Sequence, residues 1–167
     1  MASDDAQVRQ LIEQQAILAQ ITNYARSVDR LDHELGKAVF HPEAVADYGA
    51  MFQGTGWGFI DWCLHSHLSL LSHSHQFSNI SIAIDGDRAR SETYGDVTVR
   101  WRGADGVTSV MRNLGRYIDK WEKRDGTWRI FHRHYVHDMD YGGPVAVAGL
   151  YDMTGRRDRN DASYFAQ

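Results

Sequence analysis

The second half of the sequence constrains the fold most, because it consists of long strand-like segments joined by short turns. Ile80, Ile82 and Ile84 alternate with small or polar residues, which is the periodicity of a strand. Further segments of this kind follow at 90–101, 107–122 and 127–138. Turn signals separate them, at Asp85-Gly86-Asp87, Gly103-Ala104-Asp105-Gly106 and Arg124-Asp125-Gly126. The pattern predicts a meander of long antiparallel strands.

The first half of the chain differs, because its apolar residues follow helical spacing. From Asp4 to about Asp32 they recur three, four and seven residues apart, at Val8, Leu11, Leu18, Ile21, Ala25 and Val28. A short helix before Gly36, a break at Phe40-His41-Pro42, one or two short strands over 43–52, a loose turn through Gly54, Gly56 and Gly58, and a helix over 57–71 are expected next. Helices first and long strands second predict an α+β fold.

A strongly curved antiparallel or mixed sheet, covered by these helices on one face, would enclose a cone-shaped pocket for a small ligand. We expect a single domain over 1–167, in which 141–167 form an irregular C-terminal tail or lid. The basic cluster Arg156-Arg157-Asp158-Arg159 is predicted to be a solvated part of that tail.

Charge and composition exclude several classes of protein. The net charge is −4 and no long basic run occurs, so we expect no nucleic-acid partner. No apolar window approaches the ~18 residues of a membrane span and the N-terminus has no signal-like segment, so we predict no membrane association and a cytoplasmic location. Cys63 is alone and is expected at a buried helix position.

Cofactor motifs are also missing. Gly54-Thr55-Gly56-Trp57-Gly58 has neither a preceding strand nor a following lysine, so we expect no nucleotide cofactor. No GxSxG elbow for covalent hydrolysis occurs. His65, His67, His73 and His75 lack the spacing of a zinc site, so we predict no metal.

Asp29 is the most unusual residue of the first predicted helix. On a helical wheel it falls in line with Leu11, Leu18 and Ala25, on the apolar side. A carboxylate there is costly unless it has a partner. The partner could be Arg26, three residues earlier, or a following turn that the carboxylate caps, or a histidine of the pocket.

Two pairs of histidines could supply that partner. His65 and His67 lie two apart on a helix and so do not share a face. His73 and His75 lie two apart at a strand entry, where that spacing puts both on one face. A histidine has a pKa of about 6.5, which suits proton abstraction at neutral pH. A buried carboxylate would orient such a base and stabilise its protonated form.

The remaining polar candidates for the pocket are Tyr24, Tyr48, Asp96 and Arg133. Arg133 alternates with Phe131 and Tyr135, so these three are predicted to share a face of the last strand. An arginine there could hold an anion or a carbonyl oxygen. Alternatively, it could form an ion pair with Asp96 or Glu92 on a neighbouring strand.

Over roughly residues 7–140, the domain core, the sequence resembles the SnoaL-like branch of the nuclear transport factor 2-like superfamily. The segments that carry the resemblance are Ile21-Thr22-Asn23-Tyr24-Ala25-Arg26-Ser27-Val28-Asp29, Phe40-His41-Pro42-Glu43-Ala44, His75-Gln76-Phe77-Ser78-Asn79, Gly115-Arg116-Tyr117-Ile118-Asp119 and Arg124-Asp125-Gly126-Thr127-Trp128-Arg129-Ile130. Their order and spacing are similar to those of the cofactor-free lyases of this branch, such as the scytalone dehydratase, hexachlorocyclohexane dehydrochlorinase and bile-acid 7α-dehydratase families.

The resemblance implies a cystatin-like α+β barrel, a homo-oligomer (a trimer or a dimer), and an Asp–His dyad formed by Asp29 and His75. It selects His75 over His73 through the spacing to Asn79. It further implies site roles for Tyr48, Tyr24 and Arg133. The second catalytic histidine of the scytalone enzymes has no match on the segment 90–101. Strand parity would also place His75 on the face opposite Ile80 unless a bulge intervenes.

We therefore expect a cofactor-independent lyase of the dehydratase type, which acts on a small apolar substrate that contains a ring. Two alternatives stay open. One is an isomerase, cyclase or hydrolase that uses the same dyad. The other is a protein without catalysis, either a ligand carrier or a module like the small subunit of a dioxygenase. The superfamily includes all of these, and a fold alone does not decide among them.

Overall fold

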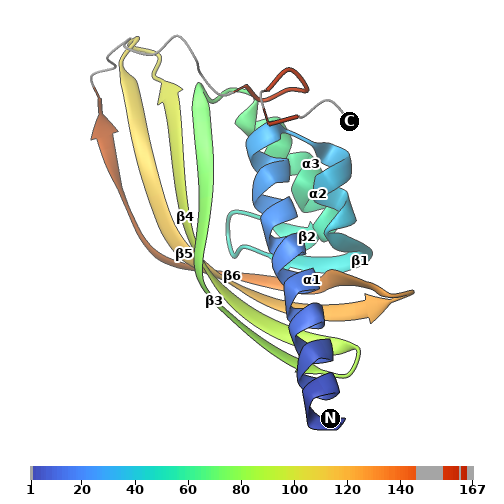
Figure 1. The fold of residues 1–167 in the computed structure, drawn as a ribbon. Coiled ribbons are helices and arrows are strands. Elements are labelled where there is room, and N and C mark those ends of the chain that lie inside the picture. The colour runs from blue at the N-terminus through green and yellow to red at the C-terminus, as the bar shows by residue number, and fades with distance from the viewer. Residues whose placement is uncertain (1, 146–155, 162, 165–167) are drawn as a thin grey trace.

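The computed structural model describes residues 2–145, 156–161, 163 and 164. Its elements in chain order are α1 (Ala2–Arg30), α2 (His33–Ala38), β1 (Phe40–Asp47), β2 (Gln53–Thr55), α3 (Gly56–His67), β3 (Ser72–Asp85), β4 (Arg88–Arg102), β5 (Thr108–Arg124) and β6 (Thr127–Pro144). Figure 1 shows the helices gathered on one side of a curved sheet. The predicted α+β class is confirmed.

The strands form one six-stranded sheet in the order β2-β1-β6-β5-β4-β3. β1 pairs with β6 in parallel, and every other neighbouring pair is antiparallel. The meander from β3 to β6 is confirmed. The sheet curves strongly but stays open, because its edge strands β2 and β3 do not pair with each other within the described residues.

Helix α1 packs its C-terminal half against the concave face of the sheet. Its buried stripe is Ile17, Ile21, Tyr24 and Val28, spaced four, three and four residues apart. Leu11, which the wheel placed in line with Asp29, is 63% exposed. The N-terminal end of α1 extends past the sheet (Figure 1), and the apolar residues before the buried stripe, Val8, Leu11 and Ile12, are exposed.

Strand β3 contains a bulge, and side chains before and after the bulge point to the same inner face of the sheet. The register with β4 shifts between Ser78 and Ser81, and Asn79 has a φ of 46°. As a result, Phe77 and Ile80 both pack against the core although they are three residues apart. The bulge that the position of His75 required is therefore present.

A second bulge, in β6, corrects the predicted face of Phe131. The register with β5 shifts between Ile130 and His132, so Phe131 is the extra residue. Ile130 and Arg133 are buried on the inner side, whereas Phe131 is only half-buried. The prediction that Phe131 and Arg133 share a face was wrong, because the extra residue in a bulge interrupts the alternation of side chains between the two faces of a strand.

The segment around the early glycines also differs from expectation. Pro42 lies inside β1, where the register with β6 shifts, so the expected break is an irregular strand. The loose turn was wrong as well: Thr55 caps α3 by accepting a hydrogen bond from the Gly58 amide at 3.1 Å. A Cβ at Gly56 would lie 2.6 Å from the ring of Phe40, so only glycine fits there.

The described C-terminal residues are docked only in part, because Arg157 is half-buried whereas Arg156, Asp158 and Arg159 are exposed, as predicted. Strand β6 continues to Pro144, beyond the predicted end at residue 138. Arg157 donates hydrogen bonds to the carbonyl oxygens of His67 (2.7 Å) and Leu70 (2.8 Å), at the end of α3. The predicted solvated cluster is therefore wrong for Arg157. The predicted lid lies largely in 146–155, outside the described residues.

Among the described helices, none is long and apolar enough to cross a membrane.

Candidate functional site

A cavity of about 640 Å³ lies between the concave face of the sheet and helices α1 and α3. Its wall is mostly apolar. The lining residues are Tyr24, Tyr48, Gly49, Met51, Phe59, Trp62, Cys63, Ser66, His67, Leu70, His75, Val97, Val99, Met111, Asn113, Tyr117, His134, Tyr135 and His137. A cavity of this size and character suits a small ring compound held by a few polar groups.

The predicted dyad is assembled at one end of this cavity. His75 Nδ1 lies 2.8 Å from Asp29 Oδ1, and the backbone N–H of His75 donates to both carboxylate oxygens at 3.1 Å. Both side chains are largely shielded, with 5% of His75 and 17% of Asp29 exposed. An ionised carboxylate only accepts, so the ring carries its hydrogen on Nδ1. His75 Nε2 is then left as a free base beside the cavity.

The adjacent histidine, His73, is fixed differently. Its Nε2 lies 2.9 Å from the Val28 carbonyl oxygen, so that nitrogen carries the hydrogen and donates. Burial is the main cause that lowers the pKa of His73. His73 does not line the cavity and lies 4.0 Å from Asp29. The two histidines share a face, as predicted, but only His75 reaches the ligand space.

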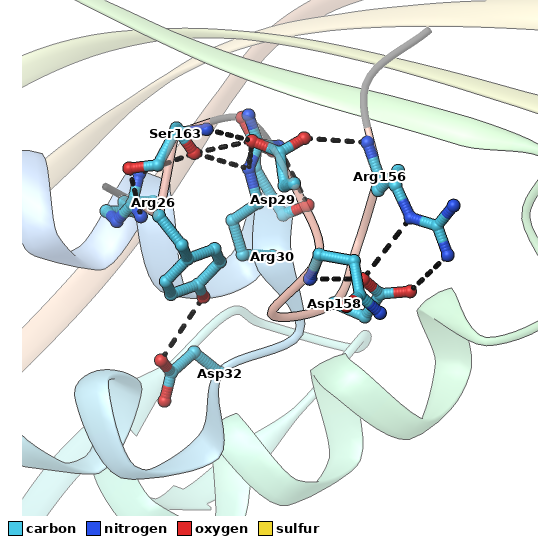
Figure 2. Close-up of polar contacts among 10 residues, drawn as sticks. Arg26, Asp29, Arg30, Asp32, Arg156, Asp158 and Ser163 are labelled. Carbon is cyan, nitrogen blue, oxygen red and sulfur yellow. Dashed lines mark hydrogen bonds and ion pairs between the residues drawn. The ribbon is translucent and has the colours of Figure 1, made fainter. Parts of the chain in front are cut away.

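The alternative partner of Asp29, Arg26, is engaged elsewhere. Arg26 donates to Ser163 Oγ at 3.1 Å, and its guanidinium lies 4.7 Å from the centre of the Tyr164 ring. Figure 2 shows Arg26 and Arg30 turned toward the docked C-terminal residues. The side chain of Asp29 is thus left to His75.

Tyr24 and Tyr48 place their hydroxyl groups together on the cavity wall. The two oxygens are 3.1 Å apart. The Tyr48 ring stacks on Phe59 with centroids 4.0 Å apart, which fixes its orientation. Burial raises the pKa of both phenols, and the charge of Arg133 opposes this only in part. Both tyrosines therefore remain protonated; one hydroxyl donates to the other, and the second keeps its hydrogen for a ligand.

Arg133 does not line the cavity but lies behind its tyrosines. Its guanidinium sits 4.1 Å from the centre of the Tyr24 ring and 4.6 Å from that of Tyr117. It forms two hydrogen bonds of 2.7 Å with Asp119, not with Asp96 or Glu92. Burial disfavours the charge, but Asp119 together with Tyr48 and Tyr24 outweighs this, and the pKa of Arg133 lies well above its ordinary value.

The expected acidic partners of Arg133 lie among other strand arginines. Asp96 pairs with Arg112, and Glu92 accepts a hydrogen bond from Arg116 at 2.9 Å. Asp96 is therefore occupied by Arg112 and is not a lining residue of the cavity. Arg133 pairs with Asp119 instead because both residues face inward at paired positions of β6 and β5.

The polar lining residues that were not assigned to the site from the sequence include His67 and Asn113, together with Ser66, His134 and His137. His67 follows Ile60, Cys63 and Leu64 at the i, i+3, i+4, i+7 spacing of a buried helix stripe, which is the signal that could have found it. His65, two residues away, is exposed, so the two histidines do not share a face, as predicted. The Asn113 side-chain oxygen accepts a hydrogen bond from the Tyr135 hydroxyl.

Strand β4 has valines, and no histidine, at the positions that face the cavity. Val97 and Val99 line the cavity from β4, beside His75 and His73 of β3 respectively. Within the described part of the chain, no three His, Cys, Asp or Glu side chains are arranged to hold a metal ion. Of the polar groups at the site, Asp29 and Tyr24 come from α1, His67 from α3 and His75 from β3, and Tyr48 directly follows β1.

A sequence model of the SnoaL-like domain family matches residues 9–134. The chain belongs to the SnoaL-like domain family. This confirms the resemblance drawn from the sequence. No curated protein matches the sequence significantly.

Solved structures share this SnoaL-like fold at low identity. A putative scytalone dehydratase from Novosphingobium aromaticivorans is 22% identical with a TM-score of 0.70, over 87% of this chain and 97% of that one. The hexachlorocyclohexane dehydrochlorinase LinA-type3 from Novosphingobium barchaimii is 16% identical with a TM-score of 0.66, over 89% and 99%. The Kfla4162 protein from Kribbella flavida is 14% identical with a TM-score of 0.71, over 79% and 95%. At these identities the likeness shows the fold alone.

Proposed function

We propose that this SnoaL-like protein is a cofactor-independent lyase that eliminates water from a small apolar substrate containing a ring. The observation that carries the proposal is the contact of 2.8 Å between Asp29 and His75 Nδ1, which leaves Nε2 of His75 as a base at the cavity. The dehydratase and dehydrochlorinase names among its structural neighbours support the same class of reaction.

The reaction begins when His75 Nε2 removes a proton from the carbon next to an activating carbonyl. The electron pair of the C–H bond forms an enolate, and Asp29 stabilises the imidazolium that results. The enolate then forms the C=C bond as the C–O bond to the leaving group breaks. The imidazolium returns its proton to the departing oxygen, which leaves as water, and His75 is again neutral.

Tyr48 and Tyr24 hold the carbonyl oxygen on which the charge of the enolate develops. Neutral hydroxyl donors in an apolar wall stabilise such an oxygen more strongly than they would in water. Arg133 acts as a positioning residue, because it lies behind the ring of Tyr24 and does not line the cavity. Its charge stabilises negative charge near both phenols.

The test uses the purified protein and a panel of cyclic β-hydroxy ketones, with 3-hydroxy-1-tetralone as the two-ring member. Products are analysed by mass spectrometry. We expect a product lighter by one water, and we expect that Asp29→Asn and His75→Ala variants lose the activity by at least about 100-fold, in line with the contribution of a general base. Product of unchanged mass would indicate isomerisation instead. Full activity in both variants would contradict the proposal.

A further inference from the structure

His67 lies on the cavity wall beside His75 but takes no part in the contact with Asp29. It belongs to the last turn of α3, and its ring centroid is 6.0 Å from that of His75. The carbonyl oxygen of His67 accepts a hydrogen bond from Arg157 at 2.7 Å, which holds this turn in place. The cavity thus presents two histidines from two different elements at one end.

The hydrogen of the neutral His67 ring belongs on Nε2. Nδ1 is buried and has no hydrogen-bond partner among the described residues. A buried N–H without an acceptor is strongly disfavoured, so Nδ1 is better left as the unprotonated nitrogen. Nε2 lies 3.9 Å from the sulfur of Cys63, which also lines the cavity. A thiol is a weak acceptor, so the Nε2–H group is available to a better one.

The surroundings of His67 keep its ring uncharged. Burial lowers its pKa to about 3, His73, His75 and Arg157 act in the same direction, and Asp29 opposes them. At neutral pH His67 is therefore a hydrogen-bond donor and not a source of a full proton. This separates its chemistry from that of His75, which must gain and release a proton.

We propose that His67 is a catalytic residue whose Nε2–H donates a hydrogen bond to the leaving hydroxyl oxygen of the substrate. The inference rests on the proposed function. Two rings whose centroids are 6.0 Å apart can both reach one oxygen atom with ordinary hydrogen bonds. That oxygen would be held by His67 and would receive its proton from His75. A hydroxyl oxygen accepts such a bond better than a carbon-bound halogen, so His67 favours loss of water over loss of halide.

The experiment compares the binding of two unreactive probes by calorimetry. 2-Tetralol has the hydroxyl group but no carbonyl, so no proton is activated, and tetralin has the same rings without the hydroxyl. The ratio of their affinities in the wild type, divided by the ratio in a variant, isolates the contact with the hydroxyl. We expect His67→Leu to reduce the preference for 2-tetralol about fivefold, the change that one net hydrogen bond of about 1 kcal/mol gives.

Two variants serve as controls. His65→Leu changes an exposed histidine of the same helix and should leave the ratio unchanged. His67→Gln supplies an amide N–H at the same position and should retain part of the preference. If His67→Leu also loses tetralin, the Gln variant decides: a retained preference supports the hydrogen bond, and a lost one overturns it.

The outcomes separate this inference from the proposed function. A ratio that does not change in His67→Leu overturns the role of His67, even if the His75→Ala variant has lost dehydration. A ratio that depends on His67 in a protein that dehydrates no ketone of the panel supports the hydroxyl contact but contradicts the lyase. Failure of both probes to bind would overturn the role of His67, whereas the proposed function would still be judged by dehydration of the ketone panel.

Discussion

The guanidinium of Arg133 and the carboxylate of Asp119 form a paired contact of two hydrogen bonds, each 2.7 Å, between neighbouring inward positions of β6 and β5. Both side chains are buried, at 1% and 0% exposure. Arg133 also lies over the rings of Tyr24 and Tyr117, so the pair sits directly beneath the cavity wall. The ion pair therefore stabilises the core and also holds in place the tyrosines that line the cavity.

Arg133→Met should destabilise the protein by about 3–5 kcal/mol, because it leaves the carboxylate of Asp119 buried without a partner. Urea unfolding would measure the loss. The double variant Arg133→Met with Asp119→Leu removes both charges and should recover most of it. Equal stability of the single and double variants would show that the pair is not coupled in this way.

Tyr48→Phe should lower kcat on a panel substrate by about 100-fold, since one donor to the developing enolate oxygen is removed. The loss of the contact with Tyr24 should cost only about 1 kcal/mol of folding stability. Tyr94→Phe, on an exposed tyrosine of β4, is the matched control and should change neither quantity. A Tyr48→Phe enzyme with unchanged kcat would remove Tyr48 from the site.

The free energy of unfolding should rise with pH between about 3 and 6.5, in part through His67. Burial lowers the pKa of folded His67 to about 3 from an ordinary value of 6.5. Between these values the unfolded chain binds the proton and the folded protein does not, so stability falls as pH falls through this range. His73, whose pKa is also lowered, acts in the same direction.

Denaturant titrations at several pH values would measure this slope. His67→Leu should make the slope smaller, and His65→Leu should leave it as in the wild type. The prediction fails if the two variants have the same slope.

Arg157→Ala should loosen the end of α3, because the carbonyl oxygens of His67 and Leu70 lose their shared donor. We expect a loss of about 1–2 kcal/mol and faster hydrogen exchange of the amides that follow His67. Arg159→Ala is the control, since the Arg159 side chain is 79% exposed. Unchanged exchange in Arg157→Ala would mean that the docked residues do not hold α3.

The sequence predicted the fold class and the long strands because alternation and Asp-Gly turns are local signals. It placed Asp29 on a buried side for a partly mistaken reason, since Leu11 of the same wheel line is exposed, on the part of α1 that precedes its buried stripe. How far a helix extends beyond the sheet depends on tertiary packing, and periodicity does not report it.

Bulges limited the prediction of the site in opposite ways. In β3, parity placed His75 and Ile80 on opposite faces unless a bulge intervened, and the structure has that bulge at Asn79. In β6, no sequence signal announced the extra residue, so Phe131 was assigned to the wrong face. The partner of Arg133 was missed because registers between strands are not local.

The most direct test of the central claim is the rate of dehydration by His75→Gln compared with His73→Gln. Both histidines face α1 from β3, but only His75 bonds Asp29 at 2.8 Å and lines the cavity. We predict that kcat/KM falls at least about 100-fold in His75→Gln and less than about tenfold in His73→Gln. Equal losses, or a larger loss in His73→Gln, would contradict His75 as the base.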